Sequence, residues 1–309
     1  MNSKFKPNSA TRGYIFGFIG VAIFSLTLPF THVAVKELDP VFTAMGRTVA
    51  AAICAIIILI ATRQPWPSKQ DIARLAIVAA GVIFGFPLFS ALAMKTATAS
   101  HGTVVLGLLP LATAFMSTIF AGEKPTQRFW LWSILGSALV VTFALWDGGR
   151  ELRGADTLLL LAVVTASMGY AAGGSLSRKL GGWQVICWAL VVALPFTLPI
   201  TIYASRDVTS AVSATSWISF AYLALMSQLI GFFAWNKGLA MGGVAKVGQV
   251  QLLQTFMTLA ASAMFFGDAF TPRSMIFATL VALCVWFGRK AQVSAVTENP
   301  PLQDSAAQA

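Results

Sequence analysis

The chain has 309 residues, of which 57% are hydrophobic and only 10% are charged, and its mean hydropathy is +0.77. Soluble domains carry about 25% charged residues, so this composition excludes an ordinary soluble protein and indicates a chain surrounded by lipid. The formal net charge is +10, but Lys and Arg lie at the ends of apolar segments rather than on one basic face, so nucleic-acid binding is not expected.

Cysteine and histidine show no metal-binding or disulfide pattern. Cys54, Cys187 and Cys284 lie singly within apolar segments, and His32 and His101 are the two histidines of the chain. We therefore expect no metal site, no cofactor and no disulfide framework, and we interpret the cysteines as small buried side chains.

Ten apolar stretches are long enough to cross a bilayer, which needs about 20 mostly apolar residues. In chain order they are 13–35, 40–61, 72–93, 98–120, 128–146, 156–177, 183–203, 214–235, 244–266 and 273–289. The short connections carry Pro, Gly and Asp, which end helices and form turns. The first stretch is longer than the core of a cleaved signal peptide, so we expect it to be retained as a helix, and Pro29 allows it to bend.

The distribution of Lys and Arg over the connections predicts the orientation. With the N-terminus in the cytoplasm, 14 of the 21 basic residues lie in inner segments and 6 in outer ones, and Arg47 lies within the second span. This positive-inside bias predicts that both termini are cytoplasmic and that the number of spans is even.

The two halves of the chain repeat each other at a lag of about 145 residues. The matching positions are Thr103, Gly107, Pro110, Ser117, Gly122, Glu123 and Thr126 in the first half, and Gly248, Leu252, Thr255, Ser262, Gly267, Asp268 and Thr271 in the second. Because each half has an odd number of spans, the second copy enters the membrane upside down. We therefore predict an all-α integral membrane protein of ten transmembrane helices, arranged as a 5+5 inverted repeat around a central cavity, which is typical of solute carriers.

The predicted organisation has five parts. These are a cytoplasmic N-terminal tail (1–12), a first five-helix repeat (13–147), an outer linker (148–155), a second five-helix repeat (156–290) and a cytoplasmic C-terminal tail (291–309). The linker belongs to the longest charged interruption of the apolar pattern. The C-terminal tail is mostly polar and contains proline, so we expect it to be disordered.

Polar side chains within the predicted spans are the candidates for a substrate site. An unsatisfied amide costs several kcal/mol in hydrocarbon, so we expect Gln251 and Gln254 of span nine to face an aqueous or substrate cavity. Thr255 lies on the same stripe, for which helix packing is the alternative interpretation. Gln228 lies near the centre of span eight, and the mid-span hydroxyl of Tyr170 needs a polar neighbour.

Ionisable residues within the spans are few. Arg47 is a candidate contact for an anionic group, with snorkelling or pairing inside the protein as the alternatives. His101, at the outer start of span four, either touches substrate, carries a proton or caps a helix. With no Asp or Glu at mid-membrane, we do not expect strong proton coupling. Nothing in the chain resembles a catalytic set, so an enzyme is not expected, whereas a channel stays an alternative.

The stretch from Ala91 to Phe143 resembles the second part of an EamA-type repeat, which defines the drug/metabolite transporter (DMT) superfamily. The motifs that carry the resemblance are Lys95-Thr96-Ala97, Leu109-Pro110, Gly122-Glu123-Lys124-Pro125-Thr126 and Gly136. The second copy, from Trp235 to Phe287, departs from the pattern with Gly267-Asp268 in place of Gly-Glu and Thr255 in place of the proline. Within the superfamily the chain is most similar to YddG-like aromatic amino acid exporters of the bacterial inner membrane.

This resemblance implies a basket of ten helices whose cavity opens alternately to each side, and export of aromatic and other amino acids or similar small amphipathic metabolites. Candidate wall residues are Phe24, Phe84, Phe86, Tyr170 and Trp235. Export of drugs, lipophilic cations or other metabolites is the alternative, although the first span lacks the membrane-embedded Glu of the small four-helix relatives. The expected partners are a small-molecule substrate and the lipid bilayer. The exact substrate, the direction, the coupling and the oligomeric state, a monomer included, stay open.

Overall fold

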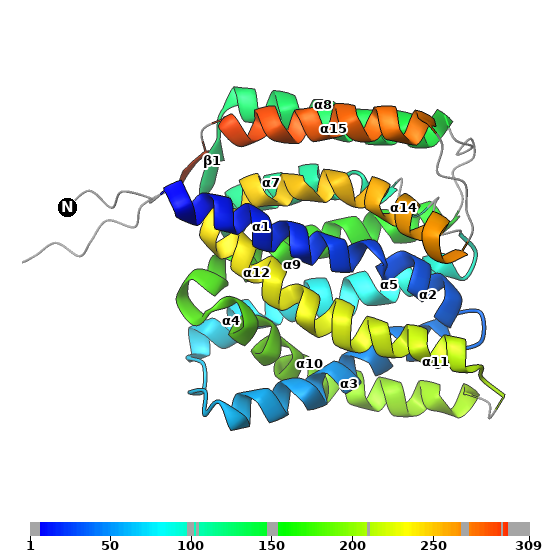
Figure 1. Ribbon diagram of the computed structural model, residues 1–309. Helices are drawn as coiled ribbons and strands as arrows, with labels where there is room; N and C mark the ends of the chain where they lie inside the picture. Colours follow the sequence, from blue (N-terminus) through cyan, green and yellow to red (C-terminus); the bar gives the residue numbers. More distant parts are fainter. Residues whose placement is uncertain are drawn as a thin grey trace, which may run out of the picture.

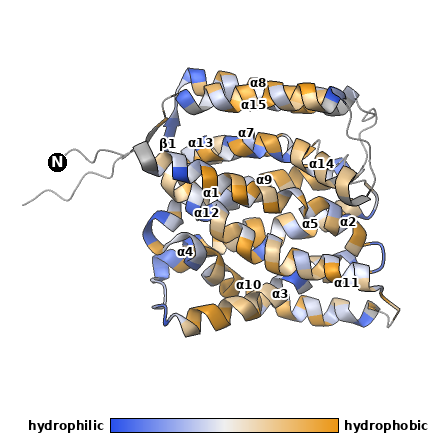
Figure 2. Cartoon of the chain, viewed as in Figure 1, coloured by the Kyte–Doolittle hydropathy of each residue, from blue (hydrophilic) through white to orange (hydrophobic). Residues whose placement is uncertain are grey.

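The computed structural model describes residues 7–97, 102, 105–146, 154–208, 211–266, 272–291 and 293–295. Within these residues the chain is helical except for its connections and one two-stranded ladder (Figure 1). Figure 2 shows that the helices are mostly hydrophobic and that the strongest hydrophilic colour gathers near helix ends and connections. This pattern is the one expected of a helical membrane protein.

The described part of every predicted span contains helix. The first half contains α1 (Pro7–Ser25), α2 (Thr27–Ala34), α3 (Pro40–Ala61), α4 (Lys69–Val78), the π-helical segment η1 (Ala79–Gly85), α5 (Phe86–Met94), α7 (Leu109–Phe120), β1 (Glu123–Pro125) and α8 (Gln127–Trp146). The second half contains α9 (Gly154–Leu180), α10 (Gly182–Ala204), the 3-10 turn η2 (Ser205–Asp207), α11 (Ala214–Ala221), the π-helical segment η3 (Tyr222–Ile230), α12 (Gly231–Gly242), α13 (Val244–Gly248), the 3-10 segment η4 (Gln249–Leu253), α14 (Gln254–Phe266), α15 (Pro272–Lys290) and β2 (Val293–Ala295).

Six helical stretches within the described residues are long and apolar enough to cross a membrane. They are Ser9–Ala34, Pro40–Ala61, Lys69–Met94, Gly154–Leu180, Gly182–Ala204 and Ala214–Gly242. They coincide with predicted spans one, two, three, six, seven and eight. The other four predicted spans contain α7, α8, α13 to α14, and α15, and their crossing of the membrane stays a prediction.

Departures from regular helix recur at the lag of the sequence repeat. The segment η1 lies in predicted span three, and a shift of 145 residues places it at 224–230, inside η3 of span eight. Likewise, the turn at residues 107–108 before α7 shifts to 252–253, inside η4 of span nine. Interrupted helices at matching places of two halves are a feature of transporters built from internal repeats.

Close helix packing places the elements around the centre of the bundle. A Cβ atom built on Gly81 of η1 would lie 2.6 Å from the carbonyl oxygen of Thr165 and 2.7 Å from the Cα atom of Gly169. Glycine at this position therefore lets the π-helical segment contact the backbone of α9 directly. By the same means, α1 packs along α12, where a Cβ on Gly238 would lie 2.6 Å from the backbone nitrogen of Gly17.

A buried carboxylate joins the two halves at the end of the bundle that carries β1. Glu123 is 3% exposed and accepts hydrogen bonds from the backbone N–H groups of Val244 and Ala245, at 2.8 and 2.7 Å. Arg178 donates to the same carboxylate at 2.7 Å. The carboxylate thereby satisfies free N–H groups in the first turn of α13 and ties β1, which follows α7, to the second half.

A short antiparallel ladder lies beside this carboxylate. β1 pairs with β2, with Glu123 opposite Ala295 and Pro125 opposite Val293. Residues 293–295 belong to the segment for which the sequence predicts a disordered tail, and in the structure they are paired with the first half. The predicted all-α fold thus holds for the helices and differs at this two-stranded ladder.

Candidate functional site

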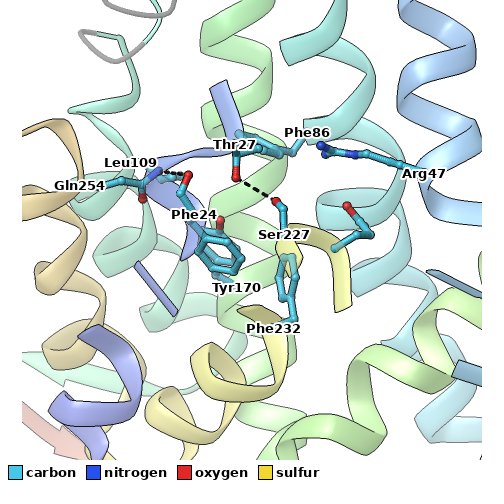
Figure 3. Close-up of a pocket in the computed structure, with 10 residues that line it drawn as sticks. Phe24, Thr27, Arg47, Phe86, Leu109, Tyr170, Ser227, Phe232 and Gln254 are labelled. Carbon is cyan, nitrogen blue, oxygen red and sulfur yellow. Dashed lines mark hydrogen bonds between the residues drawn. The ribbon is translucent and has the colours of Figure 1, made fainter. Parts of the chain in front are cut away.

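A cavity lies at the centre of the bundle, between the two halves. Its lining residues come from nine different helical elements, five residues from each half (Figure 3). They are Phe24, Thr27, Arg47, Phe86, Leu109, Tyr170, Ser227, Gln228, Phe232 and Gln254. Only about 10 Å³ of the cavity is accessible to the centre of a water molecule, which is room for a single water. In this conformation the cavity is therefore too small for an organic solute, and it must widen to admit one.

Aromatic rings form one wall of the cavity. The ring centroids of Phe24 and Phe232 are 5.0 Å apart, and those of Phe24 and Tyr170 are 6.3 Å apart with nearly parallel planes. Trp235 is fully buried behind them, with its centroid 5.3 Å from that of Tyr170. Offset and edge-to-face contacts at these distances fix the rings relative to one another. The wall is thus a preformed apolar surface suited to a flat apolar group.

Arg47 is the one charged residue among the described residues that line the cavity. Its side chain reaches from α3 toward Phe86 (Figure 3) and the residue is only 2% exposed. No described residue forms an ion pair or a hydrogen bond with it, and its Nε atom is buried without a partner. A cation removed from water costs several kcal/mol unless a counter-charge and hydrogen bonds compensate it. The position therefore favours the binding of an anionic group from outside the chain.

Hydrogen bonds between the two halves form the polar part of the lining. The Thr27 and Ser227 hydroxyl oxygens are 2.8 Å apart, and Gln254 donates its Nε2 to the Phe24 carbonyl at 3.5 Å (Figure 3).

Gln228 reaches from η3 to the other π-helical segment. It donates its Nε2 to the Val82 carbonyl of η1 at 3.1 Å, and Thr48 donates to the next carbonyl, that of Ile83, at 3.2 Å. A π-helical segment shifts the backbone hydrogen-bond pattern, which makes such carbonyls available to side chains. The two matching irregularities of the halves are thus bonded to each other beside the cavity.

The structure brings six of the ten predicted site residues to this cavity. They are Gln254, Gln228, Tyr170, Phe24, Phe86 and Arg47. Trp235 lies behind the aromatic wall, and its indole N–H has no hydrogen-bond partner among the described residues. Thr255 is buried but does not line the cavity, and His101 lies outside the described residues.

Gln251 does not face the cavity, in contrast to the sequence-based expectation. It is buried, and its Oε1 accepts a hydrogen bond of 3.5 Å from Thr113 of α7. Gln251 lies in the 3-10 segment η4, whereas Gln254 begins α14. The change of helix type between them alters the spacing of side chains around the axis, so Gln254 faces the cavity while Gln251 packs against the repeat mate of its own span. The alternative interpretation of this stripe as helix packing holds for Gln251.

Four lining residues were not among the predicted site residues. Thr27 and Ser227 are hydroxyl residues, which commonly bond a carbonyl of their own helix and so give no distinct signal. Phe232 lies one turn beyond Gln228, and helical spacing from that glutamine is the signal that could have identified it. Leu109 carries no chemical signal.

Among the described residues, Phe84, the cysteines and the potential metal ligands lie outside the central cavity. Phe84 lines a separate apolar groove of about 550 Å³ between η1 and α10 instead of the central cavity. The three cysteines are free thiols. Within the described part of the chain no group of three or more His, Cys, Asp or Glu side chains is placed to hold a metal ion.

Comparison with known proteins identifies the family. The model of the EamA-like transporter family matches residues 11–145 and 153–287, once in each half. An uncharacterized transporter of Bacillus subtilis (strain 168), YdeK, is 44% identical over 283 residues, which are 92% of this chain and 99% of that protein. Another uncharacterized transporter of this organism, YyaM, is 24% identical over 257 residues, 79% of this chain and 83% of the relative.

A solved crystal structure shares the fold at low sequence identity. It is 16% identical and superposes with a TM-score of 0.70, covering 89% of this chain and 97% of that one. The resemblance to EamA-type repeats is therefore confirmed at the level of the family and of its general activity, which is transport across a membrane. On these matches, the chain belongs to the EamA-like transporter family.

Proposed function

We propose that this transporter is a ten-span carrier of two inverted five-helix halves that exports small amphipathic solutes, with aromatic and other amino acids as the first candidates. The observation that carries the proposal is the pairing of a buried, unpartnered Arg47 with an aromatic wall in a cavity shared by both halves. An α-amino acid with a flat side chain has the two matching groups, a carboxylate and an apolar ring.

The carboxylate is the group that Arg47 would recognise. A guanidinium binds a carboxylate through two parallel N–H···O bonds, and hydrogen bonds to charged groups are worth about 1.5–3 kcal/mol each. The α-ammonium group finds neutral acceptors nearby, in the hydroxyls of Thr27 and Ser227 and the side-chain amide of Gln228. A zwitterion thus meets a partner for each of its charges.

Alternating access is supported by the small volume of the cavity and by the bonds between the halves beside it. The cavity has room for about one water, and hydrogen bonds at and beside it join one half to the other. Opening to either side requires a movement between the halves, as in carriers whose repeats rock about a central site. The described residues of the lining include neither a carboxylate nor a histidine, which favours exchange or facilitated diffusion over proton coupling.

Export of lipophilic cations is the second candidate, and the charge of the cavity disfavours it. A cation bound at the aromatic wall would lie close to Arg47, and the described lining residues offer no carboxylate to neutralise it. Like charges at close range in a low-dielectric site repel strongly.

The proposed location is the bacterial inner membrane with both termini in the cytoplasm. The end of the bundle that carries β1 would then be the cytoplasmic end. It contains Arg178 and Lys179, which pair with Glu123 and Asp71 at 2.7 and 2.8 Å. The basic residues of this end agree with the positive-inside rule.

Three ligands that share one ring test the proposal. Phenylalanine has both charges, 3-phenylpropionate lacks the ammonium group, and phenethylamine lacks the carboxylate. Calorimetric titration of the purified transporter should show binding of phenylalanine, weaker binding of 3-phenylpropionate and none of phenethylamine. Arg47→Met should abolish binding of both carboxylates, whereas Arg47→Lys should retain part of it. Tight binding of phenethylamine, with no dependence on Arg47, would instead support the lipophilic-cation candidate.

A further inference from the structure

The first span bends beside the cavity, and the bend has a chemical cause in the sequence. α1 ends at Ser25 and α2 begins at Thr27, so that Leu26 separates two helices of one span. In a continuous helix the carbonyl of Ser25 would accept the N–H of residue 29. Pro29 has no N–H, and its ring crowds the carbonyl four residues earlier. The Ser25 carbonyl is therefore left without a partner from its own helix.

Side chains of the second half donate to carbonyls at the bend. Thr258 of α14 donates its hydroxyl to the Ser25 carbonyl at 2.7 Å. Tyr222, at the start of η3, donates its hydroxyl at 2.9 Å to the Ile23 carbonyl, which also accepts the Leu26 N–H in a long bond of 3.4 Å. Buried carbonyls in hydrocarbon need such partners, because an unsatisfied one costs several kcal/mol. The bend of the first half is thus held by bonds that cross to the other repeat.

The third bond of this group differs from the other two. Gln254 donates to the carbonyl of Phe24, between the two carbonyls already described, but at 3.5 Å. This distance is at the long end for a hydrogen bond, so the bond is weak. Unlike Thr258 and Tyr222, Gln254 also lines the cavity. A polar group of a bound solute can therefore replace the Phe24 carbonyl as the hydrogen-bond partner of the Gln254 amide at a small cost in free energy.

The lining residues that flank the bend would move with it. Phe24 precedes the bend and contributes to the aromatic wall, while Thr27 follows it and bonds Ser227 of the second half. A change at Leu26 would therefore displace an apolar and a polar contact of the cavity together. A solute that binds in the cavity would contact residues on both sides of the bend, so binding can be coupled to movement of the first span.

We propose that Thr258 and Tyr222 are positioning residues that hold the bend of the first span against the second half, and that Gln254 exchanges its bond with Phe24 for one with the substrate, which loosens the bend by one of its three carbonyl bonds to the second half. This inference rests on the proposed function for the identity of the substrate. The holding of the bend by the second half does not depend on that identity and can be tested without any ligand.

The ligand-free test uses amide hydrogen exchange of the full chain in detergent, followed by mass spectrometry of peptides covering residues 22–33. Thr258→Val removes the donor to Ser25, and we expect exchange at the bend to rise about five-fold, as for the loss of one net hydrogen bond. Pro29→Ala restores a backbone N–H for the same carbonyl. The double variant Pro29→Ala with Thr258→Val should therefore exchange no faster than the natural protein.

The matched control is Thr197→Val, which removes a buried hydroxyl that bonds the Ala193 carbonyl within α10, away from the bend. This variant should leave exchange at residues 22–33 unchanged. Unchanged exchange in Thr258→Val, or fast exchange that Pro29→Ala does not reverse, would overturn the holding role of the second half.

The substrate arm tests Gln254 separately. Phenylalanine at saturating concentration should increase exchange at residues 22–33 in the natural protein but not in Gln254→Leu. If phenylalanine binds and the bend becomes protected instead, the exchange of partners at Gln254 is refuted. If phenylalanine does not bind at all by calorimetry, the proposed function fails, and the result for Thr258→Val still decides the role of the bend.

Discussion

Arg47 should lower the stability of the transporter while it enables substrate binding. The residue is 2% exposed, and its Nε is buried without a partner among the described residues, so the cost of its desolvation is not offset by an ion pair. Methionine has a similar length and no charge, and it adapts to irregular spaces. Even replacement of a buried ion pair by apolar residues of similar volume is often neutral or stabilising, by up to about 4 kcal/mol, and a buried charge without a partner has less to lose. We therefore expect Arg47→Met to raise the Tm by about 2 °C or more.

Thermal unfolding of both proteins in the same detergent, with and without phenylalanine, measures the two effects together. A ligand at 100 times its Kd adds about 2.7 kcal/mol of stability, so phenylalanine should raise the Tm of the natural protein and leave that of Arg47→Met unchanged. Arg178→Met is the matched control, because this arginine is paired with the buried Glu123. Since Arg178 is 36% exposed, its loss should destabilise by about 1 kcal/mol.

Arg47→Met and Arg178→Met are thus expected to change the Tm in opposite directions. A lower Tm for Arg47→Met would mean that Arg47 has a structural partner, and an unchanged response to phenylalanine would mean that it does not bind the carboxylate. Either result would refute the reasoning from its burial.

Three further predictions concern stability. Glu123→Gln should lower the Tm, with a loss of about 1–3 kcal/mol in the free energy of unfolding. The neutral amide has a single acceptor oxygen, so it cannot replace the carboxylate that binds Arg178 and both N–H groups at the start of α13. Gly81→Ala should destabilise by about 1–3 kcal/mol through overpacking against α9, whereas Gly173→Ala, with its nearest atom at 3.5 Å, should be tolerated; denaturation curves of the pair will show this. Hydrogen bonds from Ser213 lower the pKa of Glu37 below its ordinary value of 4.5. The ionised carboxylate therefore adds to the free energy of unfolding above pH 4.5, and this stability is lost as the pH falls through the lowered pKa. Glu37→Gln should accordingly show reduced stability at pH 7 and none of this acid dependence in unfolding scans between pH 7 and pH 3.

The helices could be predicted from the sequence because apolar length is a local property. Apolar stretches of about 20 residues predict helices wherever they occur, and the described part of each predicted span contains one. The two π-helical segments could not be predicted, because they arise from a shifted hydrogen-bond pattern without a residue signature. The ladder of β1 and β2 pairs residues far apart in the chain, for which the local pattern carries no information.

The cavity could be predicted only as far as its residues are unusual at membrane depth. Arg47, Gln228 and Gln254 stand out against an apolar background, and each of them lines the cavity. Gln251 shows the limit of this argument, because its amide is equally unusual and packs between helices instead. For the bend of the first span, the sequence indicates the position but not the side chains that hold it. Pro29 indicates that the first span can bend, but the donors to its carbonyls come from spans that only the folded chain brings near.

Counterflow in proteoliposomes tests the central claim most directly. Vesicles containing the purified transporter are preloaded with unlabelled phenylalanine and diluted into labelled phenylalanine, with vesicles containing Arg47→Met in parallel. A carrier with the proposed site predicts fast, saturable uptake of label that requires internal phenylalanine and is absent in the variant. Uptake that does not depend on internal amino acid, or that is equal in the variant, would contradict the assignment of this cavity to an amphipathic solute with a carboxylate.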